Sequence, residues 1–399
     1  FFFKQKTAYE IPKRDWSSDV CSSDLLFALY GAVCMSAHAA EGYPAFSWDR
    51  VPVYAHFGYD PNLKPEQYDF LAKHFSLVTF AAGSMRKEVE KGIAGGAAEI
   101  KKRNPSVKVL FYFAGDILHE PFTLSNESFP KDGFIEKPSV KKSINPKSGK
   151  QTEQVRYYFD KSNPVTREWW AGIAEKAVKE YGCDGVFADG LGSFGRNLIT
   201  PEKEAAMREG IMTMSKLAKE KMGPKGLLLF NPLHGEENSE YLPVTDGAMI
   251  DNFDRTMFLT DEPKAPGAKD LDMMAADIEA MSKASKAGKI IIFKAWPGFH
   301  QKDTQLMKRP HEEIVKIAAK NITFPLASFL IAAGPNCYFQ YTWGWSSDNG
   351  TFDWYPEFDK PLGAPKGDAK RDGFKYTREF EHASVFVDLE TKTGKIDWR

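Results

Sequence analysis

Short apolar runs alternate along the chain with longer stretches in which apolar residues recur at helical spacing. The runs are continuous rather than alternating, which is typical of parallel strands covered on both faces. Eight runs are present, at 51–58, 77–83, 108–115, 185–190, 226–232, 247–253, 289–298 and 335–344. Helical patterning occupies most connections, at 65–74, 86–103, 166–182, 202–222, 268–287 and 311–332. The connection between the fifth and sixth runs is short, so we expect its helix to be reduced or missing.

Eight strand-like runs that alternate with helices predict an α/β protein with a closed (β/α)8 barrel, rather than an open doubly wound sheet. No GxGxxG motif opens the first helix, which argues against a dinucleotide-binding fold. We expect the barrel to span 40–365 and the tail, 366–399, to form a small β appendage packed on it. The long connection 116–165 is expected to be functional, because loops of this length are otherwise uncommon within compact domains.

The first residues differ from the rest of the chain in pattern. Residues 1–25 have no usable periodicity and resemble translated sequencing-adapter read-through, so we exclude them from the fold. Residues 26–39 are predicted to be the remnant of a signal peptide, because an apolar stretch ends there on Ala37-His38-Ala39, a small-x-small cleavage pattern. A membrane anchor would need about 20 apolar residues. We therefore expect a mature start near Ala40 and a secreted or periplasmic protein without a membrane partner.

Charge and cysteine content narrow the class of partner. The chain has 53 basic and 54 acidic residues, whereas nucleic acids and anionic membranes are bound by a basic face. In the predicted mature chain the cysteines are Cys183 and Cys337, and neither belongs to a CxxC or Cys/His cluster. We expect them on opposite sides of the barrel as buried free thiols. No metal site and no organic cofactor are predicted.

Polar or ionisable side chains lie at the ends of seven of the eight runs. Such a side chain is costly at the end of an apolar strand unless it faces a cleft, and barrel active sites lie at the carboxyl ends of the strands. We therefore expect these residues to surround the site. They are His56, Asp116, Asp189, Asn231, Asp251, Lys294 with Trp296, and Gln340 with Tyr341, and we add Tyr112 and Trp343 as candidate substrate contacts.

Two aspartates are the candidate catalytic residues. Asp184-Gly185 is a turn signal that opens the fourth run, and Asp189 ends that run beside Gly190. Asp251 repeats the pattern two strands later. Cleavage of a glycosidic bond needs two carboxyl groups, one to protonate the leaving oxygen and one to attack the anomeric carbon or activate water. Asp189 could instead cap the following segment, and an aspartate pair could bind a divalent cation, although no third hard ligand is placed.

The other residues are candidate substrate contacts, each with a structural alternative. His56 and Asn231 could bind sugar hydroxyl groups, while Lys294 could orient a carboxylate or serve as a buried ion-pair partner. The loop 342–358 is rich in aromatic residues. Such rings at a barrel mouth can stack on sugars, or they can pack the appendage onto the barrel. The aromatic residues concerned are Trp343, Trp345, Trp354 and Tyr355.

Three segments resemble a known group of families. The segment 181–189, YGCDGVFAD, is similar to the fourth-strand motif aromatic-Gly-x-Asp-Gly-x-Phe-x-Asp of the hypothetical glycosyl-hydrolase-like barrel families. The segment 246–251, DGAMID, resembles their sixth strand, and the tail from Tyr376 to Trp398 resembles their C-terminal ending. More distantly, the chain resembles endo-α-1,4-polygalactosaminidase and α-galactosidase-type barrels. The resemblance implies that Asp189 is the nucleophile or base and Asp251 the general acid.

The sequence therefore predicts a secreted glycoside hydrolase that cleaves a poly- or oligosaccharide with a pair of aspartates. Two alternatives from other classes remain. A non-catalytic carbohydrate-binding barrel would keep the aromatic mouth but would lack two carboxyl groups facing one cleft. A metal-dependent hydrolase or deacetylase would use aspartates and histidines and would lose activity on chelation.

Overall fold

The computed structural model describes residues 42–144, 151–254 and 267–399, and the segments 1–25 and 26–39 lie outside them. Eight parallel strands form one sheet in chain order. They are β1 (Ala55–Gly58), β2 (Leu77–Ala81), β3 (Lys108–Ala114), β6 (Gly185–Asp189), β7 (Leu227–Asn231), β8 (Gly247–Ile250), β9 (Ile290–Ala295) and β10 (Cys337–Tyr341). Each predicted run therefore contains one strand.

The sheet closes on itself between its first and last strands. Val53, just before β1, forms a parallel bridge with Phe339 of β10. The amide of Tyr54 donates to the carbonyl of Phe339 at 2.9 Å, and the amide of Phe339 donates to the carbonyl of Pro52 at 2.8 Å. These bonds satisfy backbone groups that an open edge would expose. The predicted (β/α)8 barrel is confirmed.

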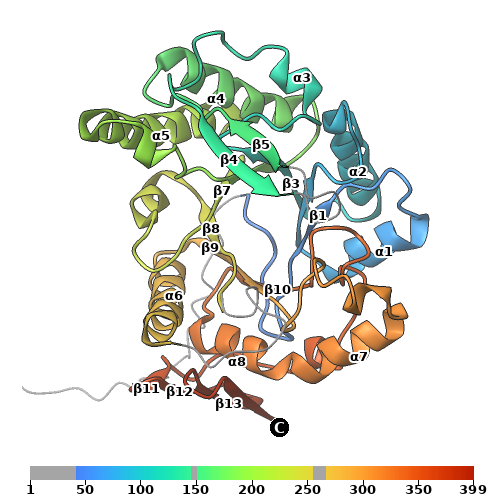
Figure 1. Cartoon of the computed structure of the whole chain (residues 1–399). Coiled ribbons are helices and arrows are strands. Elements are labelled where there is room, and N and C mark those ends of the chain that lie inside the picture. The colour runs from blue at the N-terminus through green and yellow to red at the C-terminus, as the bar shows by residue number, and fades with distance from the viewer. Residues whose placement is uncertain (1–41, 145–150, 255–266) are drawn as a thin grey trace, which may run out of the picture. The chain divides into compact units, whose positions relative to one another are not determined.

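Helices surround the strands, as Figure 1 shows. They are α1 (Pro65–His74), α2 (Val89–Arg103), α4 (Pro164–Lys179), α5 (Pro201–Met222), α6 (Ala268–Lys286), α7 (His311–Asn321) and α8 (Thr323–Ala332). Only a 3-10 helix, Ser239–Val244, connects β7 to β8, so the expected reduction of that helix is confirmed.

The predicted helical stretch 311–332 is divided in two. The structure bends by 48° between α7 and α8. Pro325 lies in the first turn of α8, where its missing amide is tolerated, but its ring would clash with the carbonyl four residues earlier in one continuous helix. Among the described residues no single helix is long and apolar enough to cross a membrane, and the α7–α8 pair meets that criterion only when the two are taken together.

The long third connection is ordered into short elements where it is described. It contains a helical turn, α3 (Thr123–Asn126), and an antiparallel hairpin of β4 (Ser139–Ile144) and β5 (Gln151–Arg156). Beneath them, Phe159 stacks on Phe129 with ring centroids 5.2 Å apart, and Trp169 of α4 contacts both rings. This aromatic cluster fixes the connection to the outside of the barrel.

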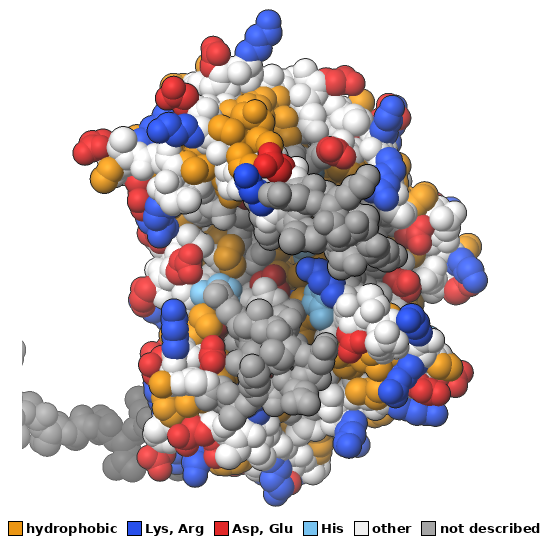
Figure 2. All heavy atoms as spheres, in the orientation of Figure 1, with side chains coloured by type: hydrophobic (Ala, Val, Ile, Leu, Met, Phe, Trp, Pro, Cys, Tyr) orange, Lys and Arg blue, Asp and Glu red, His pale blue; other side chains and the backbone are white. Residues whose placement is uncertain are grey.

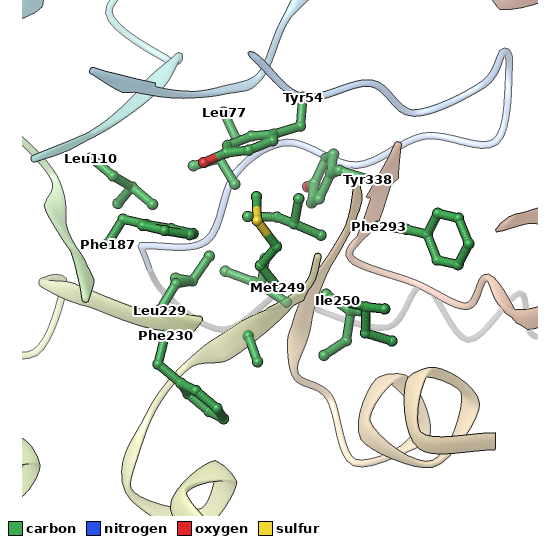
Figure 3. Packing of buried hydrophobic residues seen from close by; sticks show 14 of the residues in the cluster. Tyr54, Leu77, Leu110, Phe187, Leu229, Phe230, Met249, Ile250, Phe293 and Tyr338 are labelled. Atoms are coloured by element: carbon green, nitrogen blue, oxygen red, sulfur yellow. The ribbon is translucent and has the colours of Figure 1, made fainter. Parts of the chain in front are cut away.

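Side chains of the barrel strands alternate between the interior and the helices, as the period of two requires. In Figure 3 Phe187, Leu229 and Met249 point into the barrel, whereas Phe230 and Phe293 point outward. Phe230 contacts Tyr241 of the 3-10 helix, and Phe293 contacts Phe329 of α8. Continuous apolar runs are therefore needed because both faces are buried. Cys183 and Cys337 are buried free thiols, as predicted.

The tail forms an antiparallel sheet of β11 (Lys370–Asp372), β12 (Lys375–Glu379), β13 (Ala383–Asp388) and β14 (Thr393–Trp398), which confirms the predicted appendage. Figure 1 shows it outside α8, which β12, β13 and β14 contact. The buried Arg378 donates to the carbonyls of Leu330 and Ile331 at 3.0 and 3.1 Å, and to that of Ala333. Arg378 therefore satisfies carbonyls that the end of α8 leaves without helical partners.

We expect Arg378→Ala to lower the free energy of unfolding by about 2–4 kcal/mol, because it leaves several buried carbonyl groups unsatisfied. Urea unfolding monitored by circular dichroism would measure the change. The matched control is Arg371→Ala in β11, because Arg371 forms an exposed ion pair with Glu279, worth about 0–1 kcal/mol. Equal effects of the two substitutions would contradict the anchoring role of Arg378.

Candidate active site

The strand register places several of the predicted residues on the inner face of the barrel. Tyr112 of β3 pairs with Phe187 of β6, and Asp189 pairs with Asn231 of β7. Residues paired in parallel strands point to the same face, and so do residues two apart on one strand. Tyr112, Asp189 and Asn231 therefore point inward, as does Asp251, which lies two residues after the interior Met249.

A cavity of about 430 Å³ lies where these side chains meet. Five of the predicted residues line it, namely His56, Tyr112, Asp189, Asn231 and Asp251. Figure 2 shows histidine side chains on either side of an acidic side chain near the middle of this view. The volume lies within the range of about 300–1,000 Å³ that is typical of small-ligand sites.

Asp189 is held by two hydrogen bonds from neighbouring strands. The hydroxyl of Tyr112 donates to its Oδ2 at 2.7 Å, and the Nδ2 amide of Asn231 donates to its Oδ1 at 2.8 Å. An ionised carboxylate can only accept hydrogen bonds, and both oxygen atoms of Asp189 do so. The two donors fix the plane of the carboxylate while one edge faces the cavity.

Asp251 has a different environment. Among the described residues its buried Oδ1 has no hydrogen-bond partner. Burial raises the pKa of Asp251 to about 6, partly opposed by the charge of Lys294 and reinforced by the negative charge of Asp189. A carboxyl group in an apolar, weakly hydrogen-bonded position retains its proton to higher pH. The two carboxyl groups of the cavity are thus in unlike environments.

Lys294 lies behind Asp251 and is fully buried. Its ammonium donates to the carbonyls of Thr342 at 2.6 Å and Ala295 at 3.0 Å, and it lies 3.6 Å from the centre of the Trp296 ring. Burial lowers the pKa of Lys294 well below its ordinary value, against the opposing effect of Asp251. Lys294 does not line the cavity. Its charge nevertheless acts on Asp251 and opposes the rise of the pKa of Asp251.

His56 lines the cavity from β1 as a neutral ring. Burial, together with the nearby Lys294, lowers the pKa of His56 to about 3. Its ring lies 4.7 Å from that of Phe187 and 5.0 Å from that of Trp345. Among the described residues its buried Nδ1 atom has no hydrogen-bond partner.

The wall between β1 and β2 has almost no side chains. Gly58, Ala81, Ala82 and Gly83 line the cavity there. A Cβ atom on Gly58 would lie 2.3 Å from the Cα atom of Gly83, and Gly83 itself has a φ of +59°. The two glycines are therefore required by the close approach of their backbones.

Sequence comparison assigns the family. The model of the family described as hypothetical glycosyl hydrolase family 15 matches residues 101–384. The chain belongs to hypothetical glycosyl hydrolase family 15. The protein is a glycoside hydrolase, as the sequence predicted, and its substrate is a carbohydrate. No curated protein matches this family member significantly.

Solved structures similar to this hypothetical glycosyl hydrolase include three α-amylases. The enzyme from Geobacillus thermoleovorans, in complex with acarbose, has a TM-score of 0.47 and 12% identity, covering 86% of this chain and 87% of the amylase. An Anoxybacillus α-amylase has a TM-score of 0.46 and 12% identity, with 86% and 88% covered. One from Malbranchea cinnamomea has a TM-score of 0.46 and 10% identity, with 86% and 85% covered.

Asp116 lies beside this family member's cavity rather than in its lining. Its carboxyl group packs against Gly190, because a Cβ atom on Gly190 would lie 2.7 Å from the Cγ atom of Asp116. Burial raises the pKa of Asp116, and the charge of Lys161 opposes that shift. The buried ammonium of Lys161 donates to the carbonyls of Leu191 and Ser193 at 2.6 and 2.7 Å. Lys161 and Asp116 thus fix the loop that follows Asp189.

Four other predicted contacts lie outside the cavity lining. Gln340 is buried in the barrel and donates to the carbonyl of His56 at 2.9 Å. Tyr341, one residue later, faces outward and donates to the carbonyl of Ala318 in α7 at 2.8 Å. Trp296 stacks on His300, and Trp343 packs against Phe299. Their geometry gives no support to a direct substrate contact in this cavity.

Sequence reasoning missed several residues of the site. His119 lines the cavity from the third loop, but it does not end a strand. Trp345, one of the aromatic residues predicted at the barrel mouth, lines the cavity from the eighth loop. The Nδ1 atom of His234 lies 3.1 Å from Oδ2 of the buried Asp277 in α6, and His234 acts electrostatically on Asp251. This pair joins a loop to a distant helix, so no local motif contains it.

Among the described residues no group of three or more His, Cys, Asp or Glu is placed to hold a metal ion.

We expect Gly190→Ala to destabilise the protein more than Gly182→Ala, although the two glycines have nearly equal φ of +65° and +67°. Nothing lies within 4 Å of a Cβ atom on Gly182, so this control measures only the left-handed backbone strain, about 1–2 kcal/mol. The contact with Asp116 should add about 1–3 kcal/mol at Gly190. Urea unfolding would measure both, and a double variant with Asp116→Ala should recover the difference. If Gly190→Ala and Gly182→Ala lowered the free energy of unfolding equally, and Asp116→Ala recovered none of the loss, the packing of Asp116 against Gly190 would be contradicted.

Proposed function

We propose that Asp189 and Asp251 are the catalytic pair, and that the enzyme cleaves a glycosidic bond within a poly- or oligosaccharide outside the cytoplasm. The supporting observation is that two carboxyl groups at the ends of β6 and β8, which are separated by one strand, line one cavity in unlike environments. Hydrolysis needs one protonated and one ionised carboxyl group at the working pH. The raised pKa of Asp251 fits the general acid, and the doubly hydrogen-bonded Asp189 fits the nucleophile or base.

In this mechanism Asp251 gives its proton to the glycosidic oxygen as the bond from that oxygen to the anomeric carbon breaks. Asp189 either attacks the anomeric carbon, to be displaced later by water, or takes a proton from the water that attacks. The net reaction consumes one water and releases two sugars. The rings of Tyr112 and Trp345 line the cavity, and sugar C–H faces can pack on them.

Export is a second part of the proposal. It is supported by the apolar segment and the small-x-small pattern that ends at Ala39. Expression with an intact signal sequence, followed by fractionation and N-terminal sequencing, would test it. A mature protein starting near Ala40 in the periplasm or medium is the expected result, and retention in the cytoplasm would contradict it.

We expect Asp189→Asn and Asp251→Asn each to lower kcat by about 10²–10⁴-fold while leaving the fold intact, because each removes one proton-transfer or nucleophilic group without changing its volume. A screen of the mature protein against polysaccharides would identify the substrate, and steady-state kinetics would then measure the loss. Circular dichroism would check the fold.

The chain offers matched controls for both aspartates. Asp184 and Asp246 precede the same strands, β6 and β8, at the opposite end of the barrel, and they bind Lys101 and Lys219 at 2.6 Å. Because that end contributes stability rather than catalysis, Asp184→Asn and Asp246→Asn should lower stability but keep kcat within about threefold.

Turnover that survives in Asp189→Asn or Asp251→Asn would remove that residue from the mechanism. Binding without turnover in the wild type would favour a carbohydrate-binding barrel, and loss of turnover on chelation would favour a metal-dependent hydrolase.

We expect kcat/KM to fall as the pH rises through about 6, because Asp251 must be protonated to act as the acid and its pKa is about 6. Below that pH the proton is present, and above it activity should fall about tenfold per pH unit. An aryl glycoside with a nitrophenolate leaving group needs no proton, so its profile should lack this limb. The role of Asp251 would be contradicted if kcat/KM fell over the same pH range for both substrates, or if the fall were centred well below pH 5.

A further inference from the structure

A second cavity adjoins the catalytic one. It has a volume of about 800 Å³ and is formed by the loops that follow β9 and β10. Ser346 lines both cavities. The two cavities therefore lie side by side, as subsites for successive units of one saccharide chain would.

Backbone and amide hydrogen bonds fix the second cavity relative to the catalytic residues. The amide of Gln301 donates to the carbonyl of Trp343 at 2.6 Å, and the amide of Trp345 donates to Oε1 of Gln301 at 3.3 Å. The amide of Trp343 in turn donates to the carbonyl of Asn349 at 3.0 Å. Because Trp345 lines the first cavity, the same loop forms one wall of each.

The charges of the two cavities are opposite. Lys302, Arg309 and His311 line the second cavity, and Asp348 is the one acidic residue in its described lining. His311 is paired with Asp353 at 2.9 Å. Within the described ranges, neither Lys302 nor Arg309 takes part in an ion pair.

Asp303, which follows Lys302 in the chain, is held by backbone amides. Asp303 accepts hydrogen bonds from the backbone amides of Gln305 and Leu306 at 3.2 and 3.0 Å, so its charge is used to fix the short 3-10 helix Leu306–Lys308. Burial lowers the pKa of His300 between the cavities, and the charges of Lys302 and Lys294 lower it further. Lys302 and Arg309 are thus the cations of this lining that an anionic ligand could bind.

The catalytic cavity is unsuited to an anion, because the charge of the catalytic carboxylate would repel one. An anionic group on the substrate is better placed beyond the cleavage point, where a guanidinium and an ammonium can bind it. Arg309 can bind a carboxylate or sulfate through two parallel hydrogen bonds, and Lys302 can add a point charge.

We propose that the second cavity is a subsite for an anionic sugar unit, bearing a carboxylate or a sulfate, of the same saccharide chain that is cleaved in the first cavity. This inference rests on the proposed function, because it takes the first cavity as the cleavage site. The substrate class is then an acidic oligo- or polysaccharide. Its anionic group contacts Arg309 and Lys302 while a neighbouring unit lies between the two aspartates.

The test is a binding measurement that needs no turnover. The full-length Asp189→Asn protein would be titrated by calorimetry with three probes of equal length: a neutral oligosaccharide, a uronic-acid oligosaccharide and a sulfated one. We expect at least one anionic probe to bind about tenfold or more tightly than the neutral one, with affinity falling as salt rises. Comparison of the two anionic probes distinguishes carboxylate from sulfate.

Charge-removing variants locate the binding. Arg309→Gln and Lys302→Gln, each added to Asp189→Asn, should weaken the anionic probe about tenfold and leave the neutral probe unchanged. Lys308→Gln is the matched control, because Lys308 is exposed on the adjacent 3-10 helix but does not line the cavity. It should change neither. Equal weakening by Lys308→Gln, or no preference for an anionic probe, would overturn the proposal.

Failure of the proposed function would be recognised separately. Anionic binding that Arg309→Gln weakens would support the subsite even if the wild-type protein cleaved no saccharide. Conversely, cleavage of an anionic saccharide with unchanged kcat/KM in Arg309→Gln would support the proposed function and overturn the subsite.

Discussion

The closed parallel pairing of eight strands is the constraint on which the rest of the structure depends. Once Val53 bridges Phe339, no strand can shift by one residue without turning its apolar side chains from one face to the other. The same register that buries Phe187 and Leu229 inside the barrel turns Asp189 and Asn231 inward at the next step of two. Packing of the interior and placement of the site are thus consequences of one set of backbone hydrogen bonds.

The interior also determines the charge states of the site. Strand ends that emerge from an apolar barrel have little water, so burial is the largest cause of the shifted pKa of His56, Asp251 and Lys294. Asp189 accepts hydrogen bonds from Tyr112 and Asn231, whereas among the described residues the buried Oδ1 of Asp251 has no hydrogen-bond partner. The difference between the two aspartates therefore originates in their neighbours on β3 and β7, and not in the aspartates themselves.

The strands, most helices and the inward residues were predictable because each depends on local periodicity. His56, Asp189, Asn231 and Asp251 each end an apolar run, and the barrel makes such ends converge. Tyr341 was assigned to the site although it follows Gln340 directly, and adjacent strand residues face opposite sides. The break between α7 and α8 was missed because apolar spacing continues across Pro325. His119, Lys161 and the His234–Asp277 pair depend on how loops fold back on the barrel, which no local pattern encodes.

The glycine wall between β1 and β2 has a consequence for how this enzyme can diverge. Elsewhere in the cavity a single substitution can exchange one side chain for another and alter the fit of a ligand. At Gly58 and Gly83 any added carbon would strike backbone rather than empty space. The shape of the cavity on this side is consequently set by the course of the main chain, and it can change only if the two loops move apart.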